Sequence, residues 1–383
     1  MQHRFCRRPS PPLRVAALVY LLTLLAGLPG CGGSGSSSGS GSGSGSSHLA
    51  YVSLPADNGI FAFRINNSSG SFTSIVGSPF PAGNSPGAML MGPSGKFLYV
   101  VNRSENTVSQ FKIDPESGSI TELTPRAPTG VTPMAMAMTS AGDMLFVLNQ
   151  ISGNISVFTI DSSSGKLAAV AGSPFPTASN PVALALTPSG KFLYVVNSNL
   201  ALVFAYTVSG AGVLQQVGVP DSVGAGPFAI AVDPKEKFVY VANLIDDTVS
   251  ILSIDAATGA LSAVAGSPFD TGVAGTTTSP ISIVVSSSGQ YIYIANHASS
   301  NIAAFSIDAT TGFPTLLAGS PFSASGSPVL LINDPNGNFI YELNQDLTFV
   351  SELSVASSTG VISSTSQQSP STTTVPVGMA VGP

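Results

Sequence analysis

The sequence predicts an all-β fold, a seven-bladed β-propeller with four antiparallel strands in each blade, over residues 48–383. A strand that ends in Asn recurs six times at a spacing of 46–53 residues, which is typical of propeller blades. Each of these strands follows a strand that begins with Pro. The composition agrees, because 40 Gly, 29 Pro and only 8% charged residues suit many short strands joined by turns.

The two ends of the repeat region each carry half of a repeat. Residues 49–54, LAYVSL, are a truncated copy of the Asn-type strand with no Pro-type strand before them. Pro376 begins a Pro-type strand that no Asn-type strand follows. We therefore expect the C-terminal strand to pair with the N-terminal blade and to close the ring, which an open solenoid would not require.

The repeated strands predict where their side chains lie. The Asn-type strands are KFLYVVN at 96–102, DMLFVLN at 143–149, KFLYVVN at 191–197, KFVYVAN at 237–243, QYIYIAN at 290–296 and NFIYELN at 338–344. The Pro-type strands begin at Pro86, Pro133, Pro181, Pro227, Pro280, Pro328 and Pro376. Large and small apolar residues alternate in the Pro-type strands, so their side chains should point alternately to two faces. We expect these strands to line a central channel, whose wall contains no Arg, Lys, His or Glu.

Three repeated features are interpreted as architecture rather than as functional sites. A D-x-x-[S/T]-G motif begins at Asp114, Asp161, Asp255 and Asp308. Asp accepts hydrogen bonds from nearby amides and Gly tolerates positive φ, so this motif predicts tight turns. The motif GSPF recurs at 77–80, 172–175, 266–269 and 319–322, and we expect its Phe to wedge between adjacent blades. Lys96, Lys191 and Lys237 should lie in solvated turns between the first and second strands.

The N-terminal segment is predicted to direct export. Residues 1–30 combine four Arg residues with an uncharged apolar run over 15–28, which suits a signal peptide. The run ends at LPGC, so we expect lipidation of Cys31. The Gly and Ser residues that follow predict a flexible tether, so that residues 31–47 join the lipid anchor to the propeller. The alternative is a cleaved secretory signal with a disordered tail. We expect a protein of the cell envelope, at the outer membrane or periplasmic face, that touches membrane only through its lipid anchor.

Charge and cysteine content exclude several classes of function. Without the four arginines of the signal, 9 basic residues remain against 19 acidic ones, and no basic cluster is present. Such a chain is a poor partner for nucleic acid, so we expect none to bind. Cys31 is the one cysteine beyond the signal, which leaves no disulfide framework. No spacing of His and Cys suggests zinc and no D-x-D-x-D loop suggests calcium, so we expect no metal. We also expect no cofactor, and we expect the protein to be a monomer.

The whole region 48–383 resembles the bacterial propeller lactonases, the 6-phosphogluconolactonase-like and YVTN-repeat group of seven-bladed proteins. The residues that carry the resemblance are the P-[S/N]-G-[K/N]-F-[L/I]-Y strands and the YV-x-N phrase. The resemblance implies an Arg and a His in a G-P-R-H motif, and a Glu after the Asn of the next strand, for lactone binding and hydrolysis. Here Phe228, Ala229 and Leu244 stand at the matching positions, although a family-like Asn-Arg pair occurs at Asn102 and Arg103.

Candidate site residues are those that break the repeat on the face formed by the loops between second and third strands and between blades. Loops on a rigid scaffold commonly carry binding sites. The candidates for catalysis are His297, Arg103, Asp246 and Asp247, and those for ligand binding are Arg126, Glu105 and Asp270. We expect a shallow pocket near His297, Asp246, Asp247 and the long loop 270–279, while Arg103 should lie three or more blades from His297.

The missing family residues lead us to expect a binding or interaction module rather than an enzyme. An unknown ligand or protein partner would engage the loop face. The alternative is a lactone hydrolase of the 6-phosphogluconolactonase type, which needs His297 or an acidic neighbour as base and an Arg within reach. A third hypothesis, a purely structural surface protein, predicts no concave pocket on that face.

Overall fold

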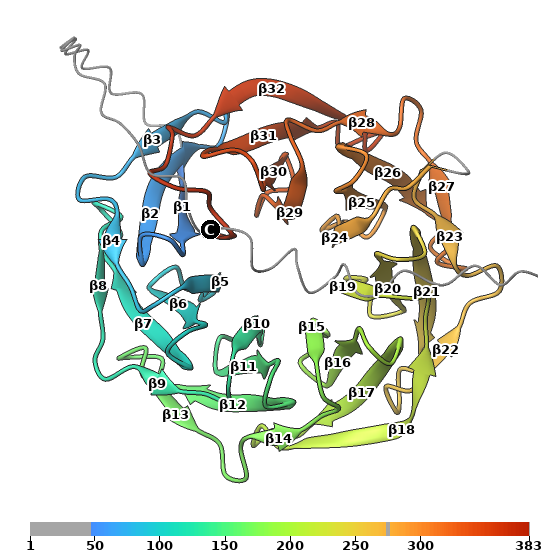
Figure 1. Cartoon of the computed structure of the whole chain (residues 1–383), viewed down its shortest axis with the longest axis horizontal. Coiled ribbons are helices and arrows are strands. Elements are labelled where there is room, and N and C mark those ends of the chain that lie inside the picture. The colour runs from blue at the N-terminus through green and yellow to red at the C-terminus, as the bar shows by residue number, and fades with distance from the viewer. Residues whose placement is uncertain (1–46, 273–275, 383) are drawn as a thin grey trace, which may run out of the picture. The chain divides into compact units, whose positions relative to one another are not determined.

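A computed structural model describes residues 47–272 and 276–382, which form a ring of seven antiparallel sheets (Figure 1). The described residues form strands, turns and loops, as the sequence predicts for an all-β propeller. Within this part of the chain, no helix is long and apolar enough to cross a membrane. The predicted signal peptide, Cys31 and the tether up to residue 46 lie outside the described residues and stay predictions.

Four concentric positions account for most strands. The innermost strands are β33 (Gly378–Val381), β5 (Pro86–Met91), β10 (Pro133–Met138), β15 (Pro181–Leu186), β19 (Pro227–Val232), β24 (Pro280–Val285) and β29 (Pro328–Asn333). The second strands are β1 (Ser47–Leu54), β6 (Phe97–Asn102), β11 (Met144–Asn149), β16 (Phe192–Asn197), β20 (Phe238–Asn243), β25 (Tyr291–Asn296) and β30 (Phe339–Asn344). The third strands are β2 (Gly59–Asn66), β7 (Thr107–Ile113), β12 (Asn154–Ile160), β17 (Leu202–Val208), β21 (Thr248–Ile254), β26 (Asn301–Ile307) and β31 (Val350–Val355).

The outer edge of each blade is completed by short strands. The outer strands are β3 (Phe72–Ser74), β8 (Ile120–Glu122), β13 (Leu167–Ala169), β18 (Leu214–Ser222), β22 (Leu261–Ala263), β27 (Pro314–Leu316) and β32 (Ile362–Gln368). Two-residue strands also pair with the third strand in five blades, namely β4 (Phe80–Pro81), β9 (Ala127–Pro128), β14 (Phe175–Pro176), β23 (Phe269–Asp270) and β28 (Phe322–Ser323). We number the blades 1 to 7 by their second strands, from β1 to β30, so that β33 completes blade 1.

Ring closure follows the prediction. The C-terminal strand β33 pairs antiparallel with β1, and Met379 lies opposite Val52 in the register. The amide of Gly382 also donates to the carbonyl of Leu49 at 2.8 Å. The two half repeats at the ends of the sequence therefore form one blade, and both termini of the repeat region contribute to its stability.

The innermost strands surround the centre of the ring (Figure 1). In β10 and β19 every residue after the leading Pro is partly exposed, as expected for strands that border a central opening. The register shifts directly after Pro133 and after Pro227 where these strands pair with the second strands. Such an irregularity is common beside a residue without an amide hydrogen, because Pro cannot donate to the ladder.

The hydrophobic core lies between adjacent blades. All six residues of β6, β11, β16, β20 and β30 are buried, and they pack against the second and third strands of the neighbouring blades. The Phe of each GSPF motif packs into one of these clusters, as predicted. Phe269, for example, makes an edge contact with Phe305 of the next blade at a centroid distance of 5.2 Å.

The Asp residues of the repeated turns have the predicted structural role. Asp161 accepts hydrogen bonds from the amides of Ser163 at 3.1 Å and Ser164 at 2.7 Å. The hydroxyl of Ser163 and these amides lower the pKa of Asp161 to about 2. Asp114, Asp255 and Asp308 make the same pair of amide contacts in their own turns. These carboxylates therefore accept hydrogen bonds from backbone amides of their own turns.

Candidate functional site

The residue that follows the Asn of each second strand occupies an equivalent place in most blades. Its amide donates to the carbonyl of the residue before the leading Pro, with distances of 2.9–3.1 Å. These residues are Arg103, Gln150, Leu244, His297 and Gln345 in blades 2, 3, 5, 6 and 7. The bond places each of them beside the start of an innermost strand. We call this face, with its loops between second and third strands and between blades, the loop face.

Arg103 reaches from this position toward the innermost strand of its own blade. A Cβ atom on Gly87 of β5 would lie 2.7 Å from Arg103 Nε, so the guanidinium lies against the backbone there. Nε is buried and has no hydrogen-bond partner among the described residues. Burial lowers the pKa of Arg103 from its usual value, although guanidinium groups keep their charge at neutral pH. Arg103 is thus a cation with a free donor near the inner edge of the ring.

His297 occupies the equivalent place in blade 6. Its Nδ1 lies 3.2 Å from the carbonyl oxygen of Pro328, the first residue of β29 in blade 7. Because a carbonyl oxygen only accepts hydrogen bonds, Nδ1 carries the hydrogen in this contact. Nε2 then has the lone pair of the neutral ring and can accept a proton. The geometry therefore presents His297 as a base through Nε2.

Asp246 and Asp247 hold loops in place. Asp247 Oδ1 accepts hydrogen bonds from the amides of Thr278 at 2.8 Å and Ser279 at 2.7 Å. Asp246 Oδ2 accepts one from the amide of Ala225 at 2.6 Å. In blade 2, Asn106 makes the same contact as Asp247, with the amide of Thr132 at 2.8 Å. The interpretation of Asp247 as a break in the repeat was wrong, because it fills a repeated loop-capping position. Any role of the two carboxylates in binding stays a prediction.

Arg126 and Glu105 belong to a separate cluster at the outer part of blade 2. Arg126 Nη1 lies 2.6 Å from Glu105 Oε2, and Arg126 Nε lies 2.7 Å from Glu122 Oε1. These bonds, with that to Glu122 first, raise the pKa of Arg126. Arg126 immediately precedes β9 at the outer edge of the blade, whereas Arg103 lies beside β5 at the inner edge. The two arginines are therefore not brought together, and Arg126 is already paired with two carboxylates.

The remaining candidates are dispersed. Asp270 is exposed and ends β23 at the outer edge of blade 5, where it pairs with Thr248. Arg103 and His297 lie in blades 2 and 6, which are three steps apart around the ring. The separation of three blades that we expected is therefore confirmed. Part of the loop 270–279, residues 273–275, lies outside the described residues.

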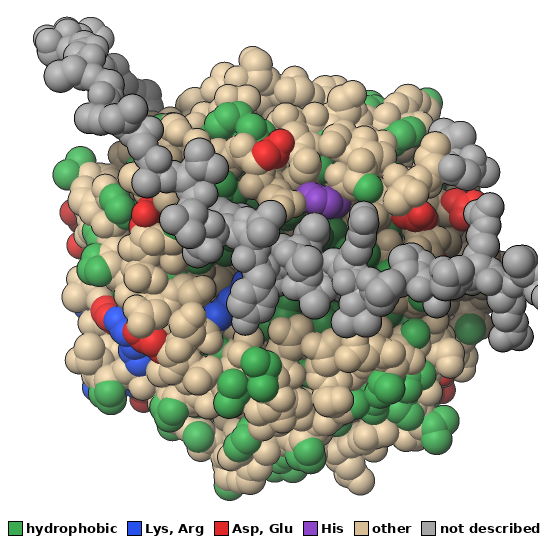
Figure 2. All heavy atoms as spheres, viewed as in Figure 1, with side chains coloured by type: hydrophobic (Ala, Val, Ile, Leu, Met, Phe, Trp, Pro, Cys, Tyr) green, Lys and Arg blue, Asp and Glu red, His purple; other side chains and the backbone are tan. Residues whose placement is uncertain are grey.

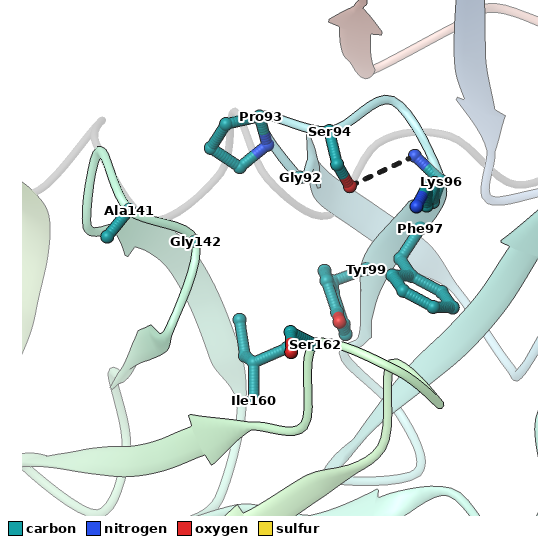
Figure 3. A pocket seen from close by; sticks show the side chains of 10 residues that line it. All are labelled: Gly92, Pro93, Ser94, Lys96, Phe97, Tyr99, Ala141, Gly142, Ile160 and Ser162. Carbon is teal, nitrogen blue, oxygen red and sulfur yellow. Dashed lines mark hydrogen bonds between the residues drawn. The ribbon is translucent and has the colours of Figure 1, made fainter.

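A pocket of about 310 Å³ lies on the opposite face, between blades 2 and 3. Its lining residues are Gly92, Pro93, Ser94, Lys96, Phe97, Tyr99, Ala141, Gly142, Ile160 and Ser162 (Figure 3). We call this side the turn face, because it carries the turns between first and second strands. Lys96 was expected to lie in a solvated turn, yet it also borders this pocket. The repeat pattern did not indicate this pocket, since residues 93–96 of the turn belong to the repeat.

The surface seen in Figure 2 is mainly hydrophobic or uncharged, and its charged side chains are scattered. In the part of the chain that the structure describes, no group of three or more His, Cys, Asp or Glu residues could hold a metal ion. On the face seen in Figure 2, electrostatic recognition therefore depends on individual charges rather than on a charged patch.

Several solved structures share the fold. A candidate 6-phosphogluconolactonase from Bacteroides uniformis superposes with a TM-score of 0.76 at 20% identity, over 88% of this chain and 99% of its own. A second candidate 6-phosphogluconolactonase, from Bacteroides fragilis, gives 0.75 at 21% identity over 90% and 100%. The periplasmic gluconolactonase of Pseudomonas aeruginosa gives 0.74 at 19% identity over 88% and 99%. At such identities the likeness establishes the fold alone.

Sequence comparison establishes the family. No curated protein matches the chain. The sequence pattern of the family described as "Lactonase, 7-bladed beta-propeller" matches residues 44–182 and 185–379, which is most of the chain. The repeated strands, their closed ring and this match lead to one conclusion: the chain belongs to the lactonase family of seven-bladed β-propellers.

Proposed function

We propose that this protein hydrolyses a sugar lactone on the loop face, near the inner edge of the ring. The observation that carries the proposal is Arg103, whose buried Nε has no hydrogen-bond partner among the described residues and lies beside the innermost strand. A donor of this kind suits a lactone carbonyl, or an acidic group on the sugar. Family membership supports lactones as the substrate class and does not support our expectation of a protein without catalytic activity.

His297 is the residue proposed to act as general base. Nε2 would take a proton from water as the water oxygen attacks the carbonyl carbon of the lactone. The ring C–O bond then breaks, and the proton passes to the leaving oxygen, which gives a hydroxy acid. Arg103 and His297 both lie beside the start of an innermost strand, so the substrate would lie between them over the centre of the ring.

The second candidate function is binding of a lactone or sugar acid without turnover. It is favoured by Phe228, Ala229 and Leu244, which stand where the family resemblance implies Arg, His and Glu. Phe228 and Leu244 pack against the apolar cluster of blades 6 and 7 instead. We further propose that the protein is a monomer in the cell envelope, anchored through Cys31. The periplasmic location of the Pseudomonas aeruginosa gluconolactonase supports an envelope location.

The test is hydrolysis of glucono-1,5-lactone and 6-phosphogluconolactone by the purified protein without its predicted signal peptide. We expect His297→Ala to lower kcat by about 100-fold, as for loss of a general base. Arg103→Met should raise KM by about 10-fold through loss of a charged hydrogen bond. Gln150→Ala, at the equivalent position of blade 3, and Arg126→Met, in the outer cluster, are matched controls that should retain activity.

Absence of hydrolysis by the unsubstituted protein would contradict the enzymatic proposal. Calorimetric titration with gluconate would then decide the second candidate, with loss of binding in Arg103→Met as the expected result. Hydrolysis that is unchanged in His297→Ala would eliminate His297 as the base.

A further inference from the structure

Two segments of this chain have the same ten residues in a row. The sequence PSGKFLYVVN occupies 93–102 in blade 2 and 188–197 in blade 4. Each segment begins in the turn between the first and second strands, on the turn face. Their environments differ at the preceding residue, which is Gly92 in blade 2 and Thr187 in blade 4, where the Thr187 hydroxyl lies 3.2 Å from the Ser189 hydroxyl. They also differ in the residues that the following blade contributes.

In blade 4 the neighbouring blade places a carboxylate on this turn. Glu236 Oε1 accepts a hydrogen bond from the amide of Ser189, and Oε2 accepts one of 2.8 Å from the Ser189 hydroxyl. Glu236 has a φ of 56°, although the corresponding residue in other blades is a Gly. The turn of blade 4 thus has a carboxylate-binding arrangement that Glu236 occupies.

In blade 2 no described residue places a carboxylate on the same turn. Ser94 takes the place of Ser189, and in both turns the Lys amide two residues on donates to the Ser hydroxyl oxygen at 3.4 Å. The residue in the place of Glu236 is Gly142, whose φ is 70°. A Cβ atom on Gly142 would lie 2.7 Å from Pro93 Cδ, so this turn of blade 3 approaches the turn of blade 2 closely.

The pocket of about 310 Å³ lies between these two turns, and both Ser94 and Gly142 line it. Figure 3 shows Ser94 on one side of the opening and Ile160 and Ser162 on the other. Phe97, Tyr99 and Ile160 supply apolar wall, and Lys96 adds a positive charge at the border. The nearby Asp143 is not among the lining residues, and its carboxylate accepts the Thr139 hydroxyl at 2.5 Å.

We propose that this pocket binds a small carboxylic acid, whose carboxylate takes the place that Glu236 takes in the blade 4 turn. The amide and hydroxyl of Ser94 would donate to the two carboxylate oxygens, and Lys96 would balance the charge. The apolar wall would contact the body of the ligand, and the volume suits a single-ring molecule. This site is separate from Arg103 and His297 and does not depend on the proposed lactonase activity.

The probe is benzoate, which joins a carboxylate to one apolar ring, with benzyl alcohol as the uncharged control. We expect benzoate to bind the purified protein at one site in calorimetric or NMR titrations, and benzyl alcohol to bind at least 10-fold more weakly. Ser94→Ala and Lys96→Gln should each weaken benzoate binding by about 10-fold, because each removes a donor to a charged group. Ser189→Ala and Lys191→Gln are the matched controls and should leave the affinity unchanged.

Exchanging the residue types at Gly142 and Glu236 tests the comparison of the blade 2 turn with the blade 4 turn directly. Gly142→Glu should abolish benzoate binding by supplying a carboxylate from within the chain. Glu236→Gly should open the turn of blade 4 and raise the number of benzoate sites from one to two. The second variant keeps the test decisive if the close contact with Pro93 prevents Gly142→Glu from folding.

Three results would overturn the proposal. One is the absence of saturable benzoate binding, and another is equal affinity in the unsubstituted protein, Ser94→Ala and Lys96→Gln. The third is loss of binding in Arg103→Met without loss in Ser94→Ala, which would place the carboxylate on the loop face. Lactone hydrolysis, measured separately, can fail or succeed without changing any of these outcomes.

Discussion

The hydroxyl of Tyr240 donates a hydrogen bond of 2.9 Å to the carbonyl of Gly312, which belongs to the Asp-containing turn of the following blade. Four other tyrosines of the second strands make the same bond to the next blade: Tyr51 to Gly118, Tyr99 to Gly165, Tyr194 to Gly259 and Tyr293 to Gly360. These buried bonds join five of the seven blades to the blade that follows. The repeated Tyr and the repeated Gly therefore form one kind of contact between neighbouring blades.

Tyr240→Phe should lower the free energy of unfolding by about 1–2 kcal/mol, because it leaves the Gly312 carbonyl without its buried donor. Chemical denaturation followed by circular dichroism measures the change. Tyr291→Phe is the matched control, since the Tyr291 hydroxyl makes no such bond in the described chain. Equal effects of the two substitutions would show that the Gly312 contact adds nothing specific.

Gly259→Ala should destabilise the protein by about 2–4 kcal/mol for two physical reasons. Gly259 has a φ of 77°, which L-residues with a Cβ adopt at a cost, and an added Cβ would lie 2.2 Å from Phe192 of the preceding blade. Gly210→Ala is the control, because no atom of the described residues lies within 4 Å of its added Cβ. Thermal unfolding should separate the two variants clearly, and a Gly259→Ala protein as stable as Gly210→Ala would refute the steric argument.

Glu352 should make the junction of blades 7 and 1 sensitive to pH. Its carboxylate is buried and lies against Gly70, and neither oxygen has a hydrogen-bond partner among the described residues. Burial, helped by the nearby Asp334, raises the pKa of Glu352 to about 7. The folded protein thus holds this proton more tightly than the unfolded chain. The contribution of the protonated carboxyl to the free energy of unfolding is fully present below pH ~4.5 and is lost as the pH rises to about 7.

Glu352→Gln should therefore stabilise the protein by about 1–3 kcal/mol at pH 8 and have little effect at pH 4. Denaturation curves at both pH values measure this difference. Glu116→Gln, at an exposed turn residue, is the control. A stabilisation by Glu352→Gln that is the same at both pH values would rule out titration of Glu352 as the cause.

Removal of residues 376–383 should leave blade 1 without its innermost strand. Strand β33 pairs with β1 over four residues, and Met379 and Ala380 are buried in clusters between blades. We expect a fall in melting temperature of at least about 10 °C or loss of soluble protein, because an open ring exposes an unpaired strand edge. Restoring the segment as a synthetic peptide should recover part of the stability. A truncated protein that melts like the full chain would contradict closure by β33.

Much of the fold could be predicted from the sequence, because the patterns that specify it are local and repeated. The Asp-containing turn depends on bonds from Asp161 to amides two and three residues away, which the local sequence specifies. The two half repeats at the ends predicted the pairing of β33 with β1. The prediction of site residues was weaker, since a departure from the repeat does not tell what a side chain contacts. Asp247 meets backbone amides and Arg126 meets two carboxylates.

The sequence by itself determined a closed ring of seven similar blades, because each blade repeats the same alternation of strands and the same turn chemistry. The tertiary structure decided which of two identical segments borders an open pocket. The turn at Ser189 is occupied by Glu236, whereas the turn at Ser94 faces Gly142 and opens into a pocket. The physical reason is that the residue which fills or empties the site lies in the next blade, almost 50 positions along the chain. Its position against the turn is set only when the blades pack.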